Sequence, residues 1–357
     1  MGFQFIRTTI NYKADWYTLI NRILIVGLGS IGKRHLRIAR ELCPSADIRV
    51  LRHKLTDEVV EYSNGSFSTI SEAVAFAPQI AVIASPAPFH VDTALILAEA
   101  YVHLLIEKPI SVSLNGVLEL IEICERNRLV LSTGYNLRFL TSLQRYRDYL
   151  TDRIVGRVLS VRCEIGQYLP LWRPSTDYRQ GVSAQRELGG GALLELSHEI
   201  DYLRWIFGEV DWVRATLSRQ SKLEIDVEDI AHLTLGFAPG LDGHQIIGTV
   251  NLDFIRHDSI RICYAVGEKG SLRWNGLLGE VAIYEVGANE WRVLFSHQHQ
   301  RDDSYLLEWK NFLECVNDRK KPLVSGFDGL KVLEIIEASR LSSANGAQIS
   351  ICNMVQQ

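Results

Sequence analysis

Residues 23–32, ILIVGLGSIG, join a short apolar run directly to three glycines with the spacing G-x-G-x-x-G. The glycines are Gly27, Gly29 and Gly32, and a helical pattern begins at about residue 31. A glycine turn between a buried strand and a helix lets the backbone approach a pyrophosphate held at the helix N-terminus. The stretch therefore predicts a dinucleotide-binding turn, and an ordinary tight loop is the alternative.

Short apolar runs alternate with helical patterns from this turn to about residue 135. The runs lie at 47–51, 80–85, 103–108 and 129–134, and the helical patterns at about 31–42, 88–100 and 113–126. Such alternation is typical of βαβ units, so the first part of the chain is predicted to form a parallel sheet.

Beyond residue 155 the apolar period becomes two, which is the period of a half-buried strand. The alternating runs lie at 157–163, 229–237, 244–253, 259–266 and 280–286, with Gly, Asp and Asn turns between them. They predict one large, mostly antiparallel sheet, and helical patterns at about 303–317 and 327–344 are expected to close this second domain. We divide the chain into an extension of unknown role (1–21), a cofactor-binding domain (22–135) and a substrate-binding and oligomerisation domain (136–357).

The composition is that of a soluble globular protein, with 357 residues of which 47% are hydrophobic, and a formal net charge of -4. No apolar run reaches the roughly 18 residues of a membrane span, and the N-terminus lacks the apolar block of a signal peptide, so we expect a cytoplasmic protein. The balanced charge argues against nucleic-acid binding. The six cysteines have neither metal-ligand nor disulfide spacing, so we expect reduced thiols and no metal.

Basic residues follow the run at 47–51, where an Asp or Glu usually binds the adenosine ribose hydroxyls. They are Arg52, His53 and Lys54. A guanidinium pairs with a 2′-phosphate that a carboxylate would repel, so NADP(H) is expected, with NAD(H) as the alternative if these are only solvated charges. The further cofactor contacts that we expect are Ser30, Ile31, Ser85, Pro86, His90, Glu107 and Lys108.

Lys108 follows a buried strand in the stretch HLLIEKP, residues 103–109. Ligands of open α/β sheets bind beyond the carboxyl ends of the strands, so this lysine is expected to face the ligand crevice. The proline after it fixes the backbone. A lysine that merely reaches solvent from a strand end is the alternative.

Three glycines precede a leucine-rich stretch in LGGGALLELSHEID, residues 188–201. At about 100° per residue, an apolar stripe lies opposite a polar face. The stripe is Leu193, Leu196, Ile200, Leu203 and Phe207, and the face is Glu195, His198, Asp201 and Tyr202. We expect one helix whose leucines anchor it while the polar face looks into a cleft, and glycines that allow close approach of a cofactor or sheet. A structurally satisfied histidine is the alternative.

Four motifs occur in order: the glycine turn, EKP after the later strand, GYN-x-RF at 134–139, and the triple glycine leading to H-x-x-D. The set resembles the glucose-fructose oxidoreductase / inositol dehydrogenase / rhizopine catabolism (Gfo/Idh/MocA) family from about residue 22 onward. The resemblance implies an N-terminal Rossmann doubly wound parallel sheet, a C-terminal α/β domain with an open sheet, and an active site between them. It places the family lysine on Lys108, the histidine on His198 and the following acid on Asp201.

One position departs from the commoner family pattern, which has an aspartate four residues before the histidine. Leu194 stands there, so Glu195 either replaces that aspartate or has another task. Because imidazole suits proton transfer near neutral pH, His198 is expected as the general acid/base with Lys108 as its partner, and Glu195 or Asp201 as the orienting group.

The segment 166–187 shows no regular pattern, and a connection of that length is usually functional. The side chains that we expect to bind substrate are Asn136, Arg138, Trp172, Arg173, Tyr178 and Arg179. Aromatic and arginine side chains in the segment suit a sugar ring with an anionic group, and a subunit contact is the alternative.

Two functions remain open at this point. One is an NAD(P)-dependent oxidoreductase acting on a carbinol or keto carbon of a sugar, amino sugar or nucleotide sugar, the substrate classes that the resemblance implies. The other is a nicotinamide-binding protein without net redox turnover, either a redox sensor or an NAD-assisted glycoside hydrolase. The resemblance implies that open sheet faces of the second domain pack against each other, and the alternating strands leave one face in need of cover, so a homodimer or homotetramer is expected.

Overall fold

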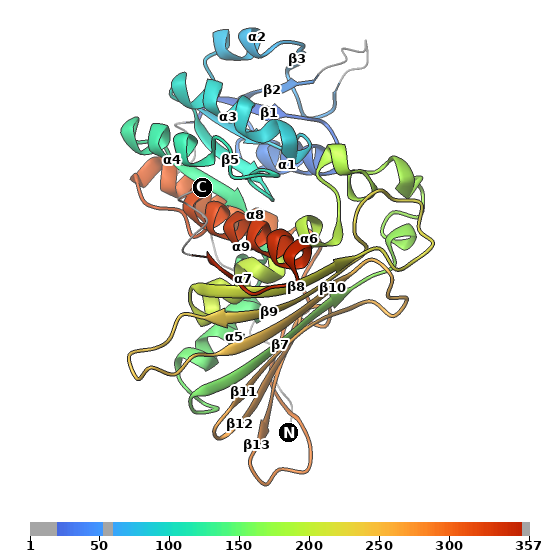
Figure 1. Ribbon diagram of the computed structural model, residues 1–357. Helices are drawn as coiled ribbons and strands as arrows, with labels where there is room; N and C mark the ends of the chain where they lie inside the picture. The colour runs from blue at the N-terminus through green and yellow to red at the C-terminus, as the bar shows by residue number, and fades with distance from the viewer. Residues whose placement is uncertain (1–19, 53–59, 352–357) are drawn as a thin grey trace.

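The computed structural model describes residues 20–52 and 60–351, which form two sheets with helices between and around them (Figure 1). Most of the N-terminal extension and the expected cofactor contact His53, with its neighbour Lys54, lie outside the described residues.

The first sheet is parallel throughout and has the order β3-β2-β1-β4-β5-β6. Its strands are β1 (Arg22–Val26), β2 (Asp47–Leu51), β3 (Gly65–Phe67), β4 (Ile80–Ile83), β5 (His103–Glu107) and β6 (Leu131–Gly134). The central strands are almost entirely buried, as strands covered on both faces must be. The strand order reverses between β1 and β4, which is where doubly wound sheets bind their ligands.

Helices cover both faces of this sheet, and one of them comes from the end of the chain. The helices are α1 (Ser30–Leu42), α2 (Ile70–Ala75), α3 (His90–Glu99), α4 (Val117–Arg126) and α8 (Asp303–Asp318). Trp309, Phe312 and Leu313 of α8 are fully buried in one cluster with Ile23 and Ile25 of β1. The prediction that this helix closes the second domain is therefore wrong: its large apolar side chains complete the core of the parallel sheet.

The second sheet has nine strands in the order β14-β13-β12-β11-β7-β10-β9-β8-β15. Their bounds are β7 (Val158–Gly166), β8 (Val210–Ser218), β9 (Ile230–Phe237), β10 (Ile247–Asp253), β11 (Ile260–Gly267), β12 (Gly270–Asn275), β13 (Glu280–Glu285), β14 (Arg292–Ser296) and β15 (Ile349–Ser350). Every pair is antiparallel except β7 with β10. The large, mostly antiparallel sheet predicted from the sequence is confirmed.

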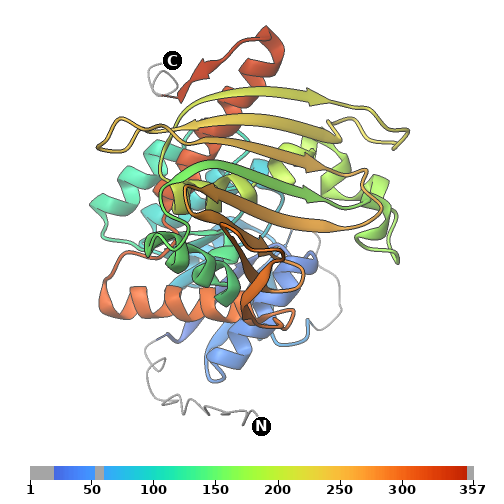
Figure 2. The ribbon, with the colours of Figure 1, turned by 90° about the horizontal axis from the view of Figure 1, so that it is seen from below.

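Helices pack on one face of this sheet, as Figure 2 shows, where the described helices lie behind the central strands. They are α5 (Thr141–Thr151), α6 (Ala192–Glu195), α7 (His198–Phe207) and α9 (Gly326–Asn345). The long helix α9 lies between the sheets and contacts β8 on one side and β6 and α4 on the other. Strand β10 keeps the alternating burial expected of a sheet with one covered face.

Several elements escaped the sequence prediction, namely β3, α2, α5, β8, β12 and β14. The described cysteines, Cys43, Cys124, Cys163, Cys263 and Cys315, are buried free thiols. Within 20–52 and 60–351, no helix combines the length and apolarity needed to cross a bilayer.

A buried cluster of four charges fastens the two halves of the chain to each other. Arg138, in the 3₁₀ turn Asn136–Phe139 just after β6, donates to both carboxylate oxygens of Asp201 at 2.9 and 2.6 Å. It also donates to Asp328 of α9 at 3.1 Å, and Arg204 of α7 donates to the same Asp328 oxygen at 2.8 Å. The cluster therefore joins the end of the parallel sheet to α7 and α9.

The contribution of this cluster to stability can be tested at Asp328. Burial raises its pKa, but Arg138, Ser325 and Arg204 outweigh burial and bring the pKa to about 2. A carboxyl with a depressed pKa stabilises the fold above its unfolded pKa of about 4, and the contribution is lost as the pH falls toward 2. We expect Asp328→Asn to lower the free energy of unfolding by about 2 kcal/mol at pH 7, and the difference from wild type to shrink between pH 4 and 2. Urea denaturation measures both values.

The matched control is Asp318→Asn, which breaks an exposed pair with Lys320 and should cost no more than about 1 kcal/mol. Equal losses of unfolding free energy in the two variants would show that the buried cluster contributes no more than an exposed ion pair.

Candidate active site

The glycine turn has the geometry of a dinucleotide cradle. Gly27 has φ +88°, and a Cβ at this position would collide with the backbone of Ala84 and Ser85 on the neighbouring strand end. A Cβ at Gly32 would collide with the carbonyl oxygen of Gly27. At Gly29, by contrast, a Cβ would meet nothing within 4 Å. Two glycines are thus required by the protein's own packing, and Gly29 leaves space open in front of α1.

The N-terminus of α1 is prepared for an anion. Gly29 is its N-cap, with no capping side chain and no acid in the first turn, so the first N–H groups of the helix, from Ser30, Ile31 and Gly32, face that open space. The helix dipole adds partial positive charge there. A pyrophosphate fits these features, which are the ones that the dinucleotide prediction requires.

A cavity of about 590 Å³ begins at this helix end and is strongly basic. Its cationic lining side chains are Lys33, Arg34, Arg37, Arg52 and Arg301, against the acids Glu61 and Asp302. Asp302 pairs with Arg34 at 2.9 Å and also with Arg37. Residues 301–302 precede α8, so a distant part of the chain completes the cavity.

The Glu107 carboxylate belongs to a buried hydrogen-bond network next to Lys108. Its carboxylate accepts from His35 Nε2 at 2.7 Å and from the backbone N–H of Lys108 at 3.1 Å, and Trp309 donates to His35 Nδ1. Burial raises the pKa of Glu107, but the His35 contact and nearby charges lower it overall. The expected contact of Glu107 with the cofactor stays a prediction, and its carboxylate oxygens are engaged by His35 and the Lys108 N–H.

His90 is likewise a buried structural group. Its two ring nitrogens lie 2.7 Å from Ser85 O and 3.0 Å from Pro109 O, and burial lowers its pKa. It ties the loop after β4 to the loop after β5. Ser85, Pro86 and Lys108 thus keep fixed positions at the carboxyl ends of these strands, although His90 itself has no ring nitrogen left for a cofactor.

Lys108 reaches from the parallel sheet into the second half of the chain. Its Nζ donates to the backbone oxygen of Glu195 at 2.8 Å. The Glu195 carboxylate turns elsewhere and accepts from Ser183 Oγ at 2.9 Å. Glu195 therefore orients Lys108 through its backbone oxygen. Its carboxylate, which the sequence offered as a replacement for the family's aspartate, binds Ser183 instead. Leu194, at the family's aspartate position, is buried.

The stretch after the triple glycine is not one helix, so that prediction is wrong. It breaks between α6 and α7, where Ser197 N–H reaches Leu194 O and Glu199 N–H reaches Leu196 O. These contacts span three residues in place of the four of an α-helix, and they tighten the chain. Tyr135 donates to Ser197 Oγ and helps to hold this turn. His198 is consequently the first residue of α7.

The glycines before α6 make room for protein rather than for a cofactor. A Cβ at Gly190 would collide with backbone oxygens of Val182 and Ser183, and one at Gly191 would meet the Glu228 carboxylate. Gly191 also has φ +108°, which favours glycine. The Glu228 carboxylate in turn accepts from Leu193 N–H at the start of α6.

His198 is partly buried and uncharged at neutral pH. Burial lowers its pKa well below 6.5, and the charges of Lys108 and Arg261 lower it further. Its Nδ1 is buried and has no hydrogen-bond partner among the described residues, and its ring stands edge to face with Tyr135 at 5.6 Å. The imidazole is therefore not satisfied as a structural histidine would be, and it lies within electrostatic reach of Lys108.

The rest of the predicted polar face is buried in the protein interior. Asp201 is 1% exposed and engaged by Arg138, and Tyr202 is fully buried against Trp274. The predicted catalytic or orienting role of Asp201 and the predicted substrate binding by Arg138 remain predictions, and in this geometry Arg138 is paired with Asp201 and Asp328. Asn136 is also buried and donates to Ser304.

The segment 166–187 forms short 3₁₀ turns: η3 (Leu169–Leu171), η4 (Tyr178–Gln180), η5 (Val182–Ala184) and η6 (Arg186–Leu188). Of the expected substrate contacts, Trp172 donates to Gln167 O and packs on Phe254, while Arg173 is exposed. The hydroxyl of Tyr178 accepts from Glu224 N–H. Gly189, two residues after the segment, lies beside Ala87 and Pro88, so the segment leads from the large sheet to the parallel sheet.

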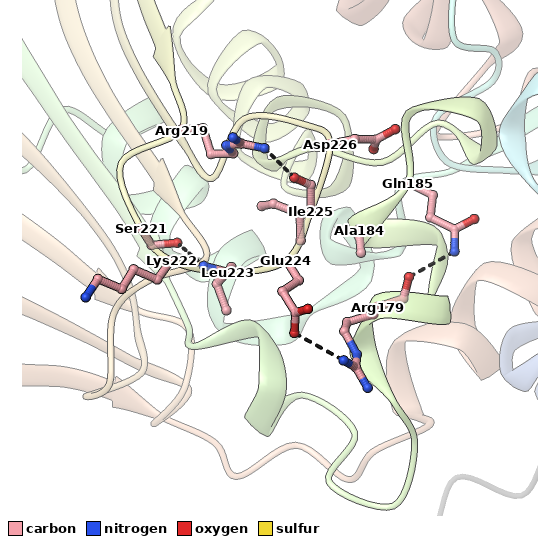
Figure 3. Close-up of a pocket in the computed structure, with 10 residues that line it drawn as sticks. All are labelled: Arg179, Ala184, Gln185, Arg219, Ser221, Lys222, Leu223, Glu224, Ile225 and Asp226. Atoms are coloured by element: carbon pink, nitrogen blue, oxygen red, sulfur yellow. Dashed lines mark hydrogen bonds and ion pairs between the residues drawn. The ribbon is translucent and has the colours of Figure 1, made fainter.

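Arg179 lines a cavity of about 540 Å³ between this segment and the loop 219–226 (Figure 3). Its guanidinium is paired with Asp177 at 2.8 Å and with Glu224 at 3.1 Å. Figure 3 shows the Arg179 and Glu224 side chains turned toward each other. Because local carboxylates already balance its charge, Arg179 holds two loops together, and the anion-binding role expected of it has no support in these contacts.

Three further residues shape the site and were missed in the sequence: Ser183, Arg261 and His35. Arg261 of β11 donates to the fully buried Glu199 at 2.8 Å and places its charge near His198. Each acts across more than ten residues of chain, so no local motif marks it.

The two halves of the chain match two family descriptions. Residues 21–135 match the oxidoreductase family, NAD-binding Rossmann fold, and residues 147–351 match the oxidoreductase family, C-terminal alpha/beta domain, both of Gfo/Idh/MocA. The chain belongs to this family. It is therefore an oxidoreductase of the nicotinamide-dependent dehydrogenase class, as the motifs had indicated.

Its relatives act on several sugars and sugar derivatives. The chain is 27% identical to myo-inositol 2-dehydrogenase of Thermotoga maritima, over 90% of this chain and 96% of that one. It is 23% identical to D-glucoside 3-dehydrogenase of Escherichia coli, over 92% and 97%. Levoglucosan dehydrogenase in complex with NADH has the same fold, with a TM-score of 0.81 at 20% identity over 93% of this chain and 99% of that one.

The open space at Gly29 generates a direct test of the cradle. We expect Gly29→Val to fold with an unchanged melting temperature, because its φ of -66° suits valine and no protein atom lies in the way. Cofactor affinity should fall by about tenfold or more, which is roughly 1.4 kcal/mol, because the side chain occupies the anion's place. Calorimetric titration and thermal melting measure the two quantities.

Gly32→Ala is the contrasting variant, since its Cβ collides with Gly27 and should lower the melting temperature as well. Undiminished cofactor binding by Gly29→Val would place the dinucleotide elsewhere.

Proposed function

We propose that the protein transfers a hydride between nicotinamide and a carbinol or keto carbon of a sugar or sugar derivative, with Lys108 and His198 moving the proton. The observation that carries the proposal is that Lys108 of the parallel sheet reaches the backbone oxygen of Glu195, three residues before His198. Lys108 ends β5 of the parallel sheet and His198 begins α7, and the Lys108 charge is close enough to lower the His198 pKa.

The protein's own groups supply the proton chemistry. In the oxidative direction the neutral His198 accepts the hydroxyl proton as the carbon gives up its hydride to the nicotinamide ring. The ammonium of Lys108, held by Glu195 O, stabilises the developing alkoxide charge. Burial keeps His198 uncharged until the proton arrives, so the base is available at neutral pH.

The substrate class is a polyol ring. Support comes from the relatives named for inositol and glucosides, which the chain matches along nearly its full length. A nicotinamide-binding protein without turnover is not favoured, because a sensor would need neither a lysine nor an unsatisfied histidine in the cleft.

NADP(H) is the proposed cofactor, and the basic cavity beside α1 supports it. Five cationic side chains line this cavity against two acids, and Arg52 stands where NAD-binding proteins carry an acid. Excess positive charge there favours a ligand with an additional phosphate.

The catalytic pair is tested by Lys108→Ala and His198→Ala once a polyol panel has given a substrate. Turnover should fall by about 10²- to 10⁴-fold in each, while cofactor affinity changes little, because the glycine turn binds the cofactor. In the oxidative direction, wild-type kcat/KM should decline only well below pH 6.5, since protonation disables His198 only below its lowered pKa. Stopped-flow and steady-state absorbance at the nicotinamide band give these values.

Glu195→Gln is the matched control, because it keeps the backbone oxygen that binds Lys108 and should lose much less turnover. Near wild-type turnover in His198→Ala would rule out the histidine as the proton acceptor.

The cofactor proposal predicts tighter binding of NADPH than of NADH, and a reversed order in Arg52→Asp, where a carboxylate would repel the 2′-phosphate. Calorimetric titration of both cofactors measures the preference. Lys33→Asp, on the neighbouring helix turn of the same cavity, should weaken NADPH less. Equal affinities in the wild type would contradict the proposal.

We also propose that the protein is a dimer or tetramer joined through the face of the large sheet turned away from α9. Ile247 of β10 is more than a third exposed on that face, which leaves apolar area for a partner copy. Sedimentation should give more than one chain per particle at micromolar concentration, and a monomer would contradict the interface.

A further inference from the structure

Three metal-ligating side chains lie together where β14 leads into α8. His297, His299 and Asp303 each offer a ligand atom within 4.8 Å of those of the other two. The two imidazole rings stand edge to face with their centroids 4.8 Å apart. Ligands that lie about 2.0–2.2 Å from one zinc ion are up to about 4 Å from each other, so the three side chains need to shift by only about 1 Å to share one ion. His297 is the exposed one of the three.

A buried hydrogen-bond pair orients His299 from behind. Its Nε2 lies 3.0 Å from Ser142 Oγ, and the Ser142 hydroxyl oxygen accepts from Trp274 Nε1 at 3.1 Å. Ser142 and Trp274 are both fully buried. When Nε2–H donates to Ser142, the lone pair of Nδ1 is left for a metal ion. Such second contacts fix the ring and tautomer of metal-bound histidines.

The other two ligands are held by the backbone around them. His297 N–H donates to Gly279 O at 3.0 Å, and Gly279, in the turn between β12 and β13, packs so closely that a Cβ would collide with His297 O. The Asp303 Oδ2 accepts from Gln300 N–H at 2.8 Å, which leaves its Oδ1 unused by that contact. The cluster is thus anchored on the β12–β13 hairpin, α5 and α8.

We propose that His297, His299 and Asp303 bind one divalent transition-metal ion of the zinc class, with solvent completing the coordination. Two imidazole nitrogens and a carboxylate oxygen form a donor set that suits zinc and not calcium or magnesium, which prefer all-oxygen sites. The expectation of no metal, which rested on the cysteines, overlooked the histidines in SHQHQRDD, residues 296–303.

The ion would tie the connection between the two sheets to the large sheet. Residues 301 and 302, which line the basic cavity, lie between the ligands His299 and Asp303, and Asp302 pairs with Arg34 of α1. None of the three ligands belongs to the Lys108–His198 pair, so the metal proposal stands or falls independently of the proposed reaction.

The experiment is a titration of the untagged full chain, freed of metal with a chelator, with Co²⁺ alone. One equivalent should give a ligand-field absorption band, and Zn²⁺ should displace it. His297→Ala, His299→Ala and Asp303→Asn should each weaken Co²⁺ binding by at least about 10- to 100-fold, and Ser142→Ala by about tenfold through the lost orientation of His299.

His232→Ala is the matched control, because His232 lies on β9 and its Nδ1 pairs with Asn251 of β10, away from the three ligands, so Co²⁺ binding should be unchanged. His297 is exposed, so His297→Ala keeps its fold and remains decisive even if the half-buried variants do not. Absence of a band in the wild type, or equal affinity in the wild type and His297→Ala, would overturn the proposal.

Discussion

The pairing of Arg138 with Asp201 and Asp328 is the constraint on which the rest of the structure depends. Burying a guanidinium is costly unless carboxylates neutralise it and accept its hydrogen bonds. Here both carboxylates come from helices of the second half of the chain, whereas Arg138 directly follows the last strand of the parallel sheet. The cluster can form only when α7 and α9 lie against that strand end, and it thereby fixes the start of α7 and the position of His198.

The site combines a positively charged lysine, Lys108, with a histidine that stays uncharged, His198. Lys108 brings a positive charge to the carboxyl end of β5 in the parallel sheet, and burial together with that charge keeps His198 neutral. The same contact that aims the lysine, its bond to Glu195 O, ties it to the break between α6 and α7. A cationic lysine and an uncharged imidazole can lie near each other because burial and the lysine charge both disfavour protonation of the imidazole.

The segment before α8 links the cofactor region to both sheets. Asp302 neutralises part of the basic cavity, α8 buries Trp309 in the core of the parallel sheet, and the histidines just upstream pack on the large sheet. Because the chain returns here, residues 301 and 302 complete the basic cavity that residues between 28 and 62 begin. A metal ion bound by His297, His299 and Asp303 and a cofactor bound in the basic cavity would act on the same short stretch of backbone.

The sequence by itself determined the features that depend on neighbours along the chain. The glycine turn, the alternation of strand and helix up to residue 134 and the period of two beyond 155 reflect local backbone geometry and local burial, and they sufficed for the fold class. Lys108 and His198 became candidates through the EKP and triple-glycine motifs and the family resemblance that these motifs carry. Only the tertiary structure decided which polar groups are paired within the protein. Asp201 and Arg138 lie 63 residues apart, Lys108 and Glu195 87, and His35 and Trp309 274. Whether a charged side chain is neutralised or left for a substrate depends on partners at such separations, and the spacing of a motif contains no information about them.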